Sequence, residues 1–141
     1  MTEEEKQLLI KDLCGRLPYF VEAQVVNTIE GESKPLTISK ELTFSDVESF
    51  ANCGVVCNIK PYLRPLTNWY MTADERIYLL EELGFDADLE NGELNDFGSY
   101  VYRRVNVLPL FDWLNAHHFD YRGLIEKGLA LEAPEGMYKT E

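Results

Sequence analysis

The segment LPLFDWLNAHHFDYRGLIEKGLALEAP, residues 108–134, carries most of the signals that decide the fold. Pro109 suits the first turn of a helix, where a missing N–H costs nothing. Apolar residues then recur at helical spacing, at Leu110, Trp113, Leu114 and His117. Because this spacing places them on one face, it predicts a helix over residues 109–117 that packs this face against the core.

A second, shorter helix is predicted to follow at once. Asp120 is a good N-cap, and the apolar residues around it fit a hydrophobic staple, which favours a sharp corner between two helices. Gly128 supplies the left-handed residue of a Schellman stop, with Leu129 placed to contact Leu124. We therefore expect a helix over residues 121–127, about two turns long.

Alternating apolar and polar residues predict strands in two regions. Residues 129–133 alternate up to Pro134 and are typical of a short strand at a sheet edge. Several alternating runs between residues 19 and 60 predict the main part of the sheet, and Pro61 is expected to end the last of them. Residues 60–68, with two prolines, are expected to form an extended connector.

Two capping boxes predict further helices. Thr2 opens one over residues 2–17 and Thr72 opens one over residues 72–83, each with a glutamate three residues later. The sequence thus predicts one α+β domain, residues 1–141, mainly β over residues 19–60 and mainly helical over residues 72–83 and 109–127. A small antiparallel sheet of three to five strands should pack with about four helices, including a C-terminal helix-corner-helix.

Three blocks of sequence are distinctive. They are KQLLIKDLCGRLPY at residues 6–19, KPYLRP at residues 60–65 and DWLNAHHFDYRGLIEKGLALEAPEGMY at residues 112–138, together about a third of the chain. They resemble small proteins of gut bacteria and their prophages, which end in close variants of the last block. That family has no assigned activity, so the resemblance implies a setting, a bacterial cytoplasm or a mobile element, and no catalytic residues.

Composition is that of a globular protein. A chain of 141 residues can bury about two thirds of its unfolded surface, and 45% hydrophobic residues exclude a disordered chain. No apolar run reaches the roughly 20 residues of a membrane span, and the acidic start is unlike a secretory signal, so we expect a cytoplasmic protein. Three cysteines do not form a disulfide framework, and Cys14 is expected as a small buried hydrophobe.

The net charge is −12, and the acidic residues concentrate in one segment. Residues 71–98 carry nine carboxylates against the single basic residue Arg76, which disfavours direct nucleic-acid binding through a broad basic surface. A partner protein should instead present a basic surface. The candidate partner-binding residues are Asp86, Asp88, Glu90, Glu93 and Asp96.

The favoured interpretation is a non-catalytic, acidic interaction protein with an accessory or regulatory role and no cofactor. The alternative is a small metal-dependent enzyme. It would use His117 or His118 with Asp112, Asp120 or the carboxylates of residues 86–96. Adjacent helical residues point about 100° apart, so the two histidines cannot bind one metal unaided, and a structural role in ending the helix is favoured.

Other motifs give little support to catalysis. The acidic loop that starts at Asp86 departs from an EF-hand at the glycine and at the final glutamate. Cys53 and Cys57 have the wrong spacing for a zinc knuckle and are too far apart in a strand for a disulfide. Arg103 and Arg104 follow the acidic segment and are expected to pair with it. The sequence has no phosphate-binding loop, GxSxG, HExxH or CxxC motif.

Overall fold

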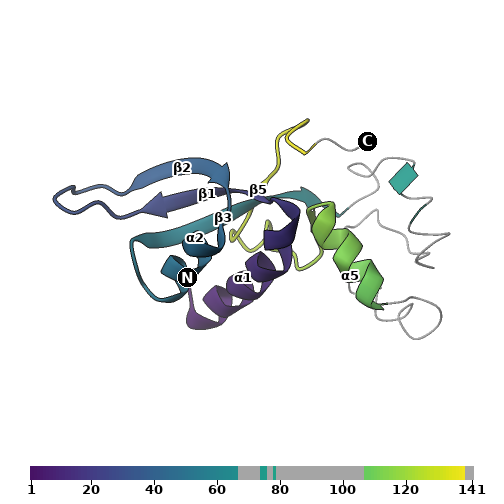
Figure 1. Cartoon of the computed structure of the whole chain (residues 1–141), viewed down its shortest axis with the longest axis horizontal. Helices are drawn as coiled ribbons and strands as arrows, with labels where there is room; N and C mark the ends of the chain where they lie inside the picture. The colour runs from purple at the N-terminus through teal and green to yellow at the C-terminus, as the bar shows by residue number, and fades with distance from the viewer. Residues whose placement is uncertain (67–73, 76–77, 79–106, 139–141) are drawn as a thin grey trace.

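The computed structural model describes residues 1–66, 74–75, 78 and 107–138 (Figure 1). These residues form an α+β fold with three α-helices and a five-stranded sheet. In chain order the elements are α1 (Glu3–Arg16), the 3₁₀ turn η1 (Leu17–Tyr19), β1 (Glu22–Asn27), β2 (Leu36–Glu41), α2 (Phe44–Ala51), β3 (Val56–Pro65), α5 (Val107–Ala116), β4 (Phe119–Asp120) and β5 (Leu131–Glu132).

The sheet is mixed, with strand order β2-β1-β3-β4 and β5 also paired to β3. β1 runs antiparallel to both β2 and β3, whereas β4 and β5 run parallel to β3. The predicted antiparallel sheet is therefore correct for the three long strands and wrong for the two short ones. Both short strands follow the long crossover that contains α5, and such a crossover is what parallel pairing requires.

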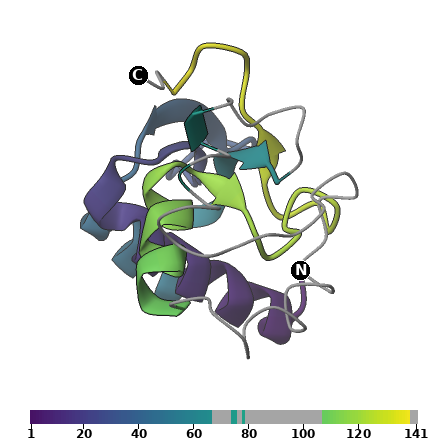
Figure 2. The same cartoon turned by 90° about the vertical axis from the view of Figure 1, so that its right-hand side faces the viewer.

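The core lies between the sheet and the two N-terminal helices. Figure 1 shows α1 and α2 next to each other on one side of the sheet, and Figure 2 shows α5 beside α1. The fully buried apolar side chains include Leu9 and Leu13 of α1, Val25 of β1 and Ile59 of β3. This burial confirms the predicted alternation as far as Val25, but not at Ile29, which is 41% exposed beyond the end of β1. In the predicted helix over residues 2–17, it confirms that Leu9 and Leu13 face the core.

α1 begins and ends as its caps predict. The Thr2 hydroxyl accepts a hydrogen bond from the Glu5 backbone N–H at 3.1 Å. Pro18 lies in the 3₁₀ turn that follows, and Phe20 then adopts a left-handed conformation with φ of 58°. Cys14 was predicted to be buried but is exposed. Successive residues of a helix point about 100° apart, so Cys14 points away from the core that the preceding Leu13 faces.

α2 lies within residues 19–60, where alternating runs, one of them with Leu42 and Phe44, predicted only strands. Thr43 and Asp46 form a full capping box, in which each side chain accepts a hydrogen bond from the other residue's backbone N–H. Val47 and Phe50 then bury the inner face of the helix. A four-residue alternation fits either structure, and the cap decides between them.

β3 is longer than predicted. Residues 60–65, expected to be a connector, continue the strand through Pro61 to Pro65. Pro61 lies opposite Ala23 of β1. The backbone N–H and C=O of Ala23 bond to β2, so Ala23 and Pro61 are not a hydrogen-bonded pair. The nitrogen of Pro61 therefore faces away from β1, and no hydrogen bond between β1 and β3 is lost. Cys53, also expected in this strand, lies in the preceding turn with φ of 55°.

The predicted helix over residues 109–117 is confirmed as α5, but the helix over residues 121–127 does not form. His118 ends α5 in a left-handed conformation with φ of 62°, and the chain continues into β4. Gly123 then adopts φ of 70°, which interrupts any helical run. The helix-corner-helix is therefore a helix followed by a short strand and a series of turns.

The caps predicted for the missing helix are nevertheless present. The Asp120 carboxylate accepts the backbone N–H groups of Leu124 (2.8 Å) and Ile125 (3.0 Å). Leu129 N–H donates to the Leu124 carbonyl (2.9 Å) and Gly128 N–H to the Ile125 carbonyl (3.0 Å), which is the Schellman pattern. The predicted strand that follows is confirmed as the two-residue β5.

Some predictions fall outside the described residues. They are most of the helix over residues 72–83, the acidic segment with residues 86–96, and Arg103 and Arg104. Of the predicted helix, Asp74, Glu75 and Tyr78 are described and are helical. Within the described part of the chain, no helix combines the length and apolar character needed to cross a membrane.

Candidate binding cleft

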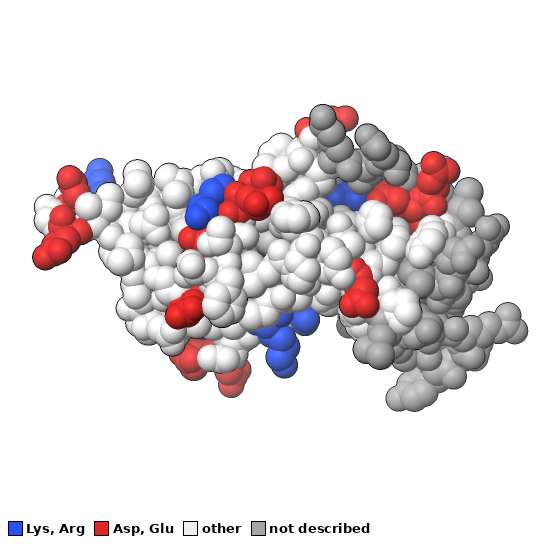
Figure 3. Space-filling view, viewed as in Figure 1, with Lys and Arg blue, Asp and Glu red and all other residues white. Residues whose placement is uncertain are grey.

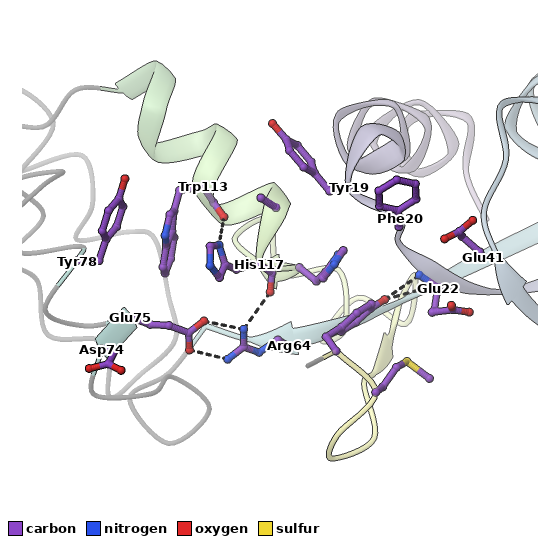
Figure 4. Close-up of a pocket in the computed structure, with 14 residues that line it drawn as sticks. Tyr19, Phe20, Glu22, Glu41, Arg64, Asp74, Glu75, Tyr78, Trp113 and His117 are labelled. Atoms are coloured by element: carbon purple, nitrogen blue, oxygen red, sulfur yellow. Dashed lines mark hydrogen bonds and ion pairs between the residues drawn. The ribbon is translucent and has the colours of Figure 1, made fainter. Parts of the chain in front are cut away.

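A cleft of about 820 Å³ opens where the start of β1, the ends of β2 and β3, and α5 meet (Figure 4). One end is aromatic, with Tyr78 and Trp113 at its wall, and the other end carries Phe20 beside Glu22 and Glu41. The C-terminal residues Met137 and Tyr138 close one side. The lining is therefore rich in aromatic rings and carboxylates.

Trp113 organises the aromatic end. The i, i+4 spacing on α5 stacks it on His117, with ring centroids 4.2 Å apart. The rings of Tyr78 and Phe119 also lie nearly parallel to the indole, with centroids 6.0 and 5.7 Å from it. His117 Nδ1 is 2.9 Å from the Trp113 carbonyl oxygen, so the imidazole is held in the helix by its own backbone.

Arg64 links three parts of the cleft floor. Its guanidinium forms two parallel hydrogen bonds to the Glu75 carboxylate, at 2.8 and 2.9 Å, and donates a third to the His117 carbonyl at 3.2 Å. The same group lies 4.1 Å above the Phe119 ring. Bidentate pairing of this kind is strong and fixes geometry, so Arg64 positions the ends of β3 and α5.

Glu22 and Glu41 lie directly opposite each other in the register of β1 and β2. Neither carboxylate has an ion pair among the described residues, and like charges in this position destabilise a sheet. Beside them Phe20 is 69% exposed and keeps its left-handed backbone conformation. This end of the cleft therefore combines an exposed aromatic ring on strained backbone with two like charges.

His118 and Tyr138 form the inner wall. Their rings stack at 3.8 Å, and the Tyr138 hydroxyl accepts the Glu22 backbone N–H at 2.9 Å and donates to the Tyr62 carbonyl at 2.7 Å. Burial lowers the pKa of His118 to about 3, and the nearby cationic Arg16 and Arg64 act in the same direction. The imidazole is therefore neutral at physiological pH. Burial also raises the pKa of the Tyr138 hydroxyl, which stays protonated.

Beneath this wall lies a charged pair that the sequence reasoning missed. Asp12 and Arg16 are both fully buried, with Arg16 Nε 2.7 Å from Asp12 Oδ2. Arg16 also donates to the Phe119 carbonyl at 2.6 Å, and Arg122 donates to Asp12 at 3.2 Å. The available signal was an Asp and an Arg four residues apart on one helix, a spacing that brings their side chains together.

The described residues of the metal-enzyme alternative do not converge, and its carboxylates at residues 86–96 lie outside the described part of the chain. Asp112 is exposed on α5, and both oxygens of Asp120 are bonded to backbone N–H groups. His117 and His118 both line the cleft, but one is bonded to a carbonyl and the other is stacked on Tyr138. Among the described residues, no group of three or more His, Cys, Asp or Glu side chains could hold a metal ion.

The cleft could be located only in part from sequence. Trp113 and His117 were predicted to share a face, but Phe20, Glu22 and Glu41 were not identified as site residues. No local pattern marks them, because the register of β1 with β2 is what brings Glu22 and Glu41 together. The predicted partner-binding residues, Asp86, Asp88, Glu90, Glu93 and Asp96, lie outside the described part of the chain.

Comparisons of the chain with protein-family models, curated proteins and solved structures found no significant match.

Proposed function

We propose that this is a non-catalytic interaction protein that binds a basic segment of a partner protein in the cleft. The observation that carries the proposal is the opposed pair Glu22 and Glu41 beside the exposed ring of Phe20. A lysine or arginine side chain placed between the carboxylates would replace a repulsion with two attractions. The same cation could lie over the Phe20 ring, a contact of about 0.5–2 kcal/mol.

The charge of the whole chain supports the same partner. A net charge of −12 attracts basic molecules and speeds their association through long-range steering. Figure 3 shows acidic side chains spread over the face in view, with basic ones fewer. The acidic segment with Asp86, Asp88, Glu90, Glu93 and Asp96 would extend this attraction, and we retain it as part of the proposal.

The polar groups of the cleft support binding more than catalysis. Arg64 is bonded to Glu75, and His117 to a backbone carbonyl. A general acid or base works best with a pKa near the operating pH, whereas the pKa of His118 is about 3. Among the described residues, the groups that remain available to a ligand are aromatic faces and the carboxylates of Glu22, Glu41 and Asp74.

Capture from native lysate tests the proposal. The full chain and a Glu22→Gln/Glu41→Gln variant serve as baits, and a Glu30→Gln/Glu32→Gln variant at the exposed hairpin tip loses the same charge elsewhere. Wild type and the tip variant should capture the same basic protein, and the cleft variant should capture it at least tenfold less, in a salt-dependent way. Equal capture by all three baits would contradict a role of the cleft.

A fourth bait separates the contribution of the acidic segment. Reversal of Asp88, Glu90 and Glu93 to Lys should weaken capture further if this segment also contacts the partner. Loss of capture in this variant alone, with the cleft variant unaffected, would move the binding site away from the cleft.

A further inference from the structure

β2 is an open edge of the sheet. It pairs only with β1 in the described residues, and its other edge meets no strand there. Leu42 N–H donates to the Val21 carbonyl at 2.9 Å, which fixes the alternation of the ladder. Because hydrogen-bonded pairs alternate along the ladder, the backbone N–H and C=O groups of Lys40 and Ile38 bond to β1. The same backbone groups of Thr37, Ser39 and Glu41 point to the open edge, away from β1.

Residues 36–39 of this edge lack the usual protection against pairing. Natural edge strands are commonly blunted by charges, by proline within the strand or by a bulge. Residues 36–39, Leu-Thr-Ile-Ser, carry no charge, and Leu36 (48%) and Ile38 (36%) are exposed. The ammonium of Lys40 is held by Asp46 at 2.9 Å. The hairpin of β1 and β2 also projects beyond the helices, so the edge is accessible (Figure 1).

The two faces of this edge differ in chemistry. Ile38 lies on the helix side, opposite the buried Val25, and the exposed Phe44 (67%) begins α2 on that side. Glu41 lies on the other face, at the end of β2 that lines the cleft. A strand added here would thus place apolar side chains on one face and a basic side chain on the other, beside the carboxylates of the cleft.

We infer that the basic partner binds as an additional antiparallel strand along β2. This inference rests on the proposed function and specifies how the partner is held. The partner's basic residue lies opposite Glu41, and apolar residues lie opposite Ile38 and Leu36. Read from its N-terminus, the partner segment therefore carries a basic residue first and apolar residues at the fourth and sixth positions.

A basic partner fits this edge better than a second copy of the chain. Each copy carries a net charge of −12, so edge-to-edge pairing would bring two strongly acidic molecules together. Backbone bonds from Thr37, Ser39 and Glu41 would supply affinity, and the alternate side chains would supply specificity, as in other cases of strand addition.

The experiment uses the full chain and a synthetic peptide with arginine first, valine at the fourth and sixth positions and threonine elsewhere. A peptide with glutamate in place of arginine is the charge control. Binding is followed by titration, and backbone amide exchange is measured by NMR. We expect the amides of Thr37, Ser39 and Glu41 to exchange at least tenfold more slowly with the arginine peptide, and the glutamate peptide to have no effect.

Ser39→Pro and Ser39→Ala form a matched pair of variants. Both lose the 3.0 Å contact of the Ser39 hydroxyl with Tyr62, but only proline removes the outward N–H. Proline should weaken peptide binding at least tenfold relative to alanine. Should circular dichroism show that Ser39→Pro is unfolded, Thr37→Pro against Thr37→Val gives the same comparison, because Thr37 has the same orientation.

The outcomes separate the two proposals. Peptide binding that shifts cleft resonances without protecting Thr37, Ser39 and Glu41 would overturn strand addition and leave the proposed function in place. Lack of peptide binding, with lysate capture still dependent on Glu22 and Glu41, would also overturn strand addition alone. Lack of both would overturn the two together.

Discussion

His118 should make the protein less stable as the pH falls below 6.5. His118 is 7% exposed, and its ring stacks on Tyr138 with Arg16 of α1 and Arg64 of β3 in its vicinity. Burial first, and these cations next, lower its pKa from 6.5 to about 3. The folded chain therefore keeps the ring neutral over a range in which the unfolded chain binds a proton.

The sign and size of the effect follow from this difference. A group whose folded pKa is lowered contributes stability that is fully present above its unfolded pKa and is lost as the pH falls toward the folded value. The loss approaches about 1.4 kcal/mol per pH unit below pH 6.5. Between pH 7 and pH 5.5, before most carboxylates titrate, His118 should account for a loss of roughly 1.3 kcal/mol.

Urea unfolding at several pH values in this interval measures the effect. His118→Asn is the test variant, because asparagine does not titrate here and tolerates the left-handed backbone at this position better than most residues. Between pH 7 and pH 5.5, the free energy of unfolding of this variant should fall by roughly 1.3 kcal/mol less than that of wild type. Loss of the stacking on Tyr138 lowers the stability of the variant equally at every pH and does not change this difference. His117→Gln should retain the contribution of His118. Parallel curves for wild type and His118→Asn would refute the reasoning.

Three further substitutions test other parts of the structure. Asp12→Ala should lower the free energy of unfolding in urea by about 3–5 kcal/mol, because it leaves Arg16 buried without its carboxylate. Asp12→Leu combined with Arg16→Met removes both charges and should cost far less. Equal losses would mean that the unpaired charge is not the cause of the destabilisation. Phe20→Gly should raise the melting temperature, because it relieves about 1–2 kcal/mol of strain in the left-handed backbone and removes a largely exposed side chain. The same variant should weaken partner capture. A lower melting temperature would contradict strain at Phe20. Gly128→Val should destabilise by about 1–2 kcal/mol and Gly128→Asn by less; no atom lies within 4 Å of an added Cβ, so a valine variant as stable as wild type would exclude backbone strain at this position.

The sequence predicted local structure well where capping residues and periodicity agree. The helix over residues 109–117 and the Schellman bonds around Gly128 are both present. The helix between them fails because Gly123 takes a left-handed conformation and the chain enters β4 first. Asp120, Gly128 and the apolar pair Leu124 and Leu129 have the spacing that caps a two-turn helix, but a series of capped turns allows the same spacing. The sequence pattern therefore could not distinguish the helix from the turns.

The site depended on information that no local pattern holds. Glu22 and Glu41 are 19 positions apart, and only the register of the hairpin makes them neighbours. A shift of one residue would place Glu41 on the opposite face from Glu22. For the same reason Thr37 and Ser39 gave no signal of an open edge, because a strand's place at the end of a sheet is a property of the whole topology.

Three unfavourable features lie along the hairpin of β1 and β2. Phe20 holds a left-handed backbone, Glu22 opposes Glu41, and β2 presents an edge without charged protection over residues 36–39. Each is destabilising or hazardous on its own, whereas both oxygens of Asp120 and the Tyr138 hydroxyl are satisfied by hydrogen bonds. A basic strand on β2 would neutralise the carboxylates and pair the edge at the same time. One ligand chemistry thus relieves two of the three features, which supports the proposal that the protein binds a basic strand there.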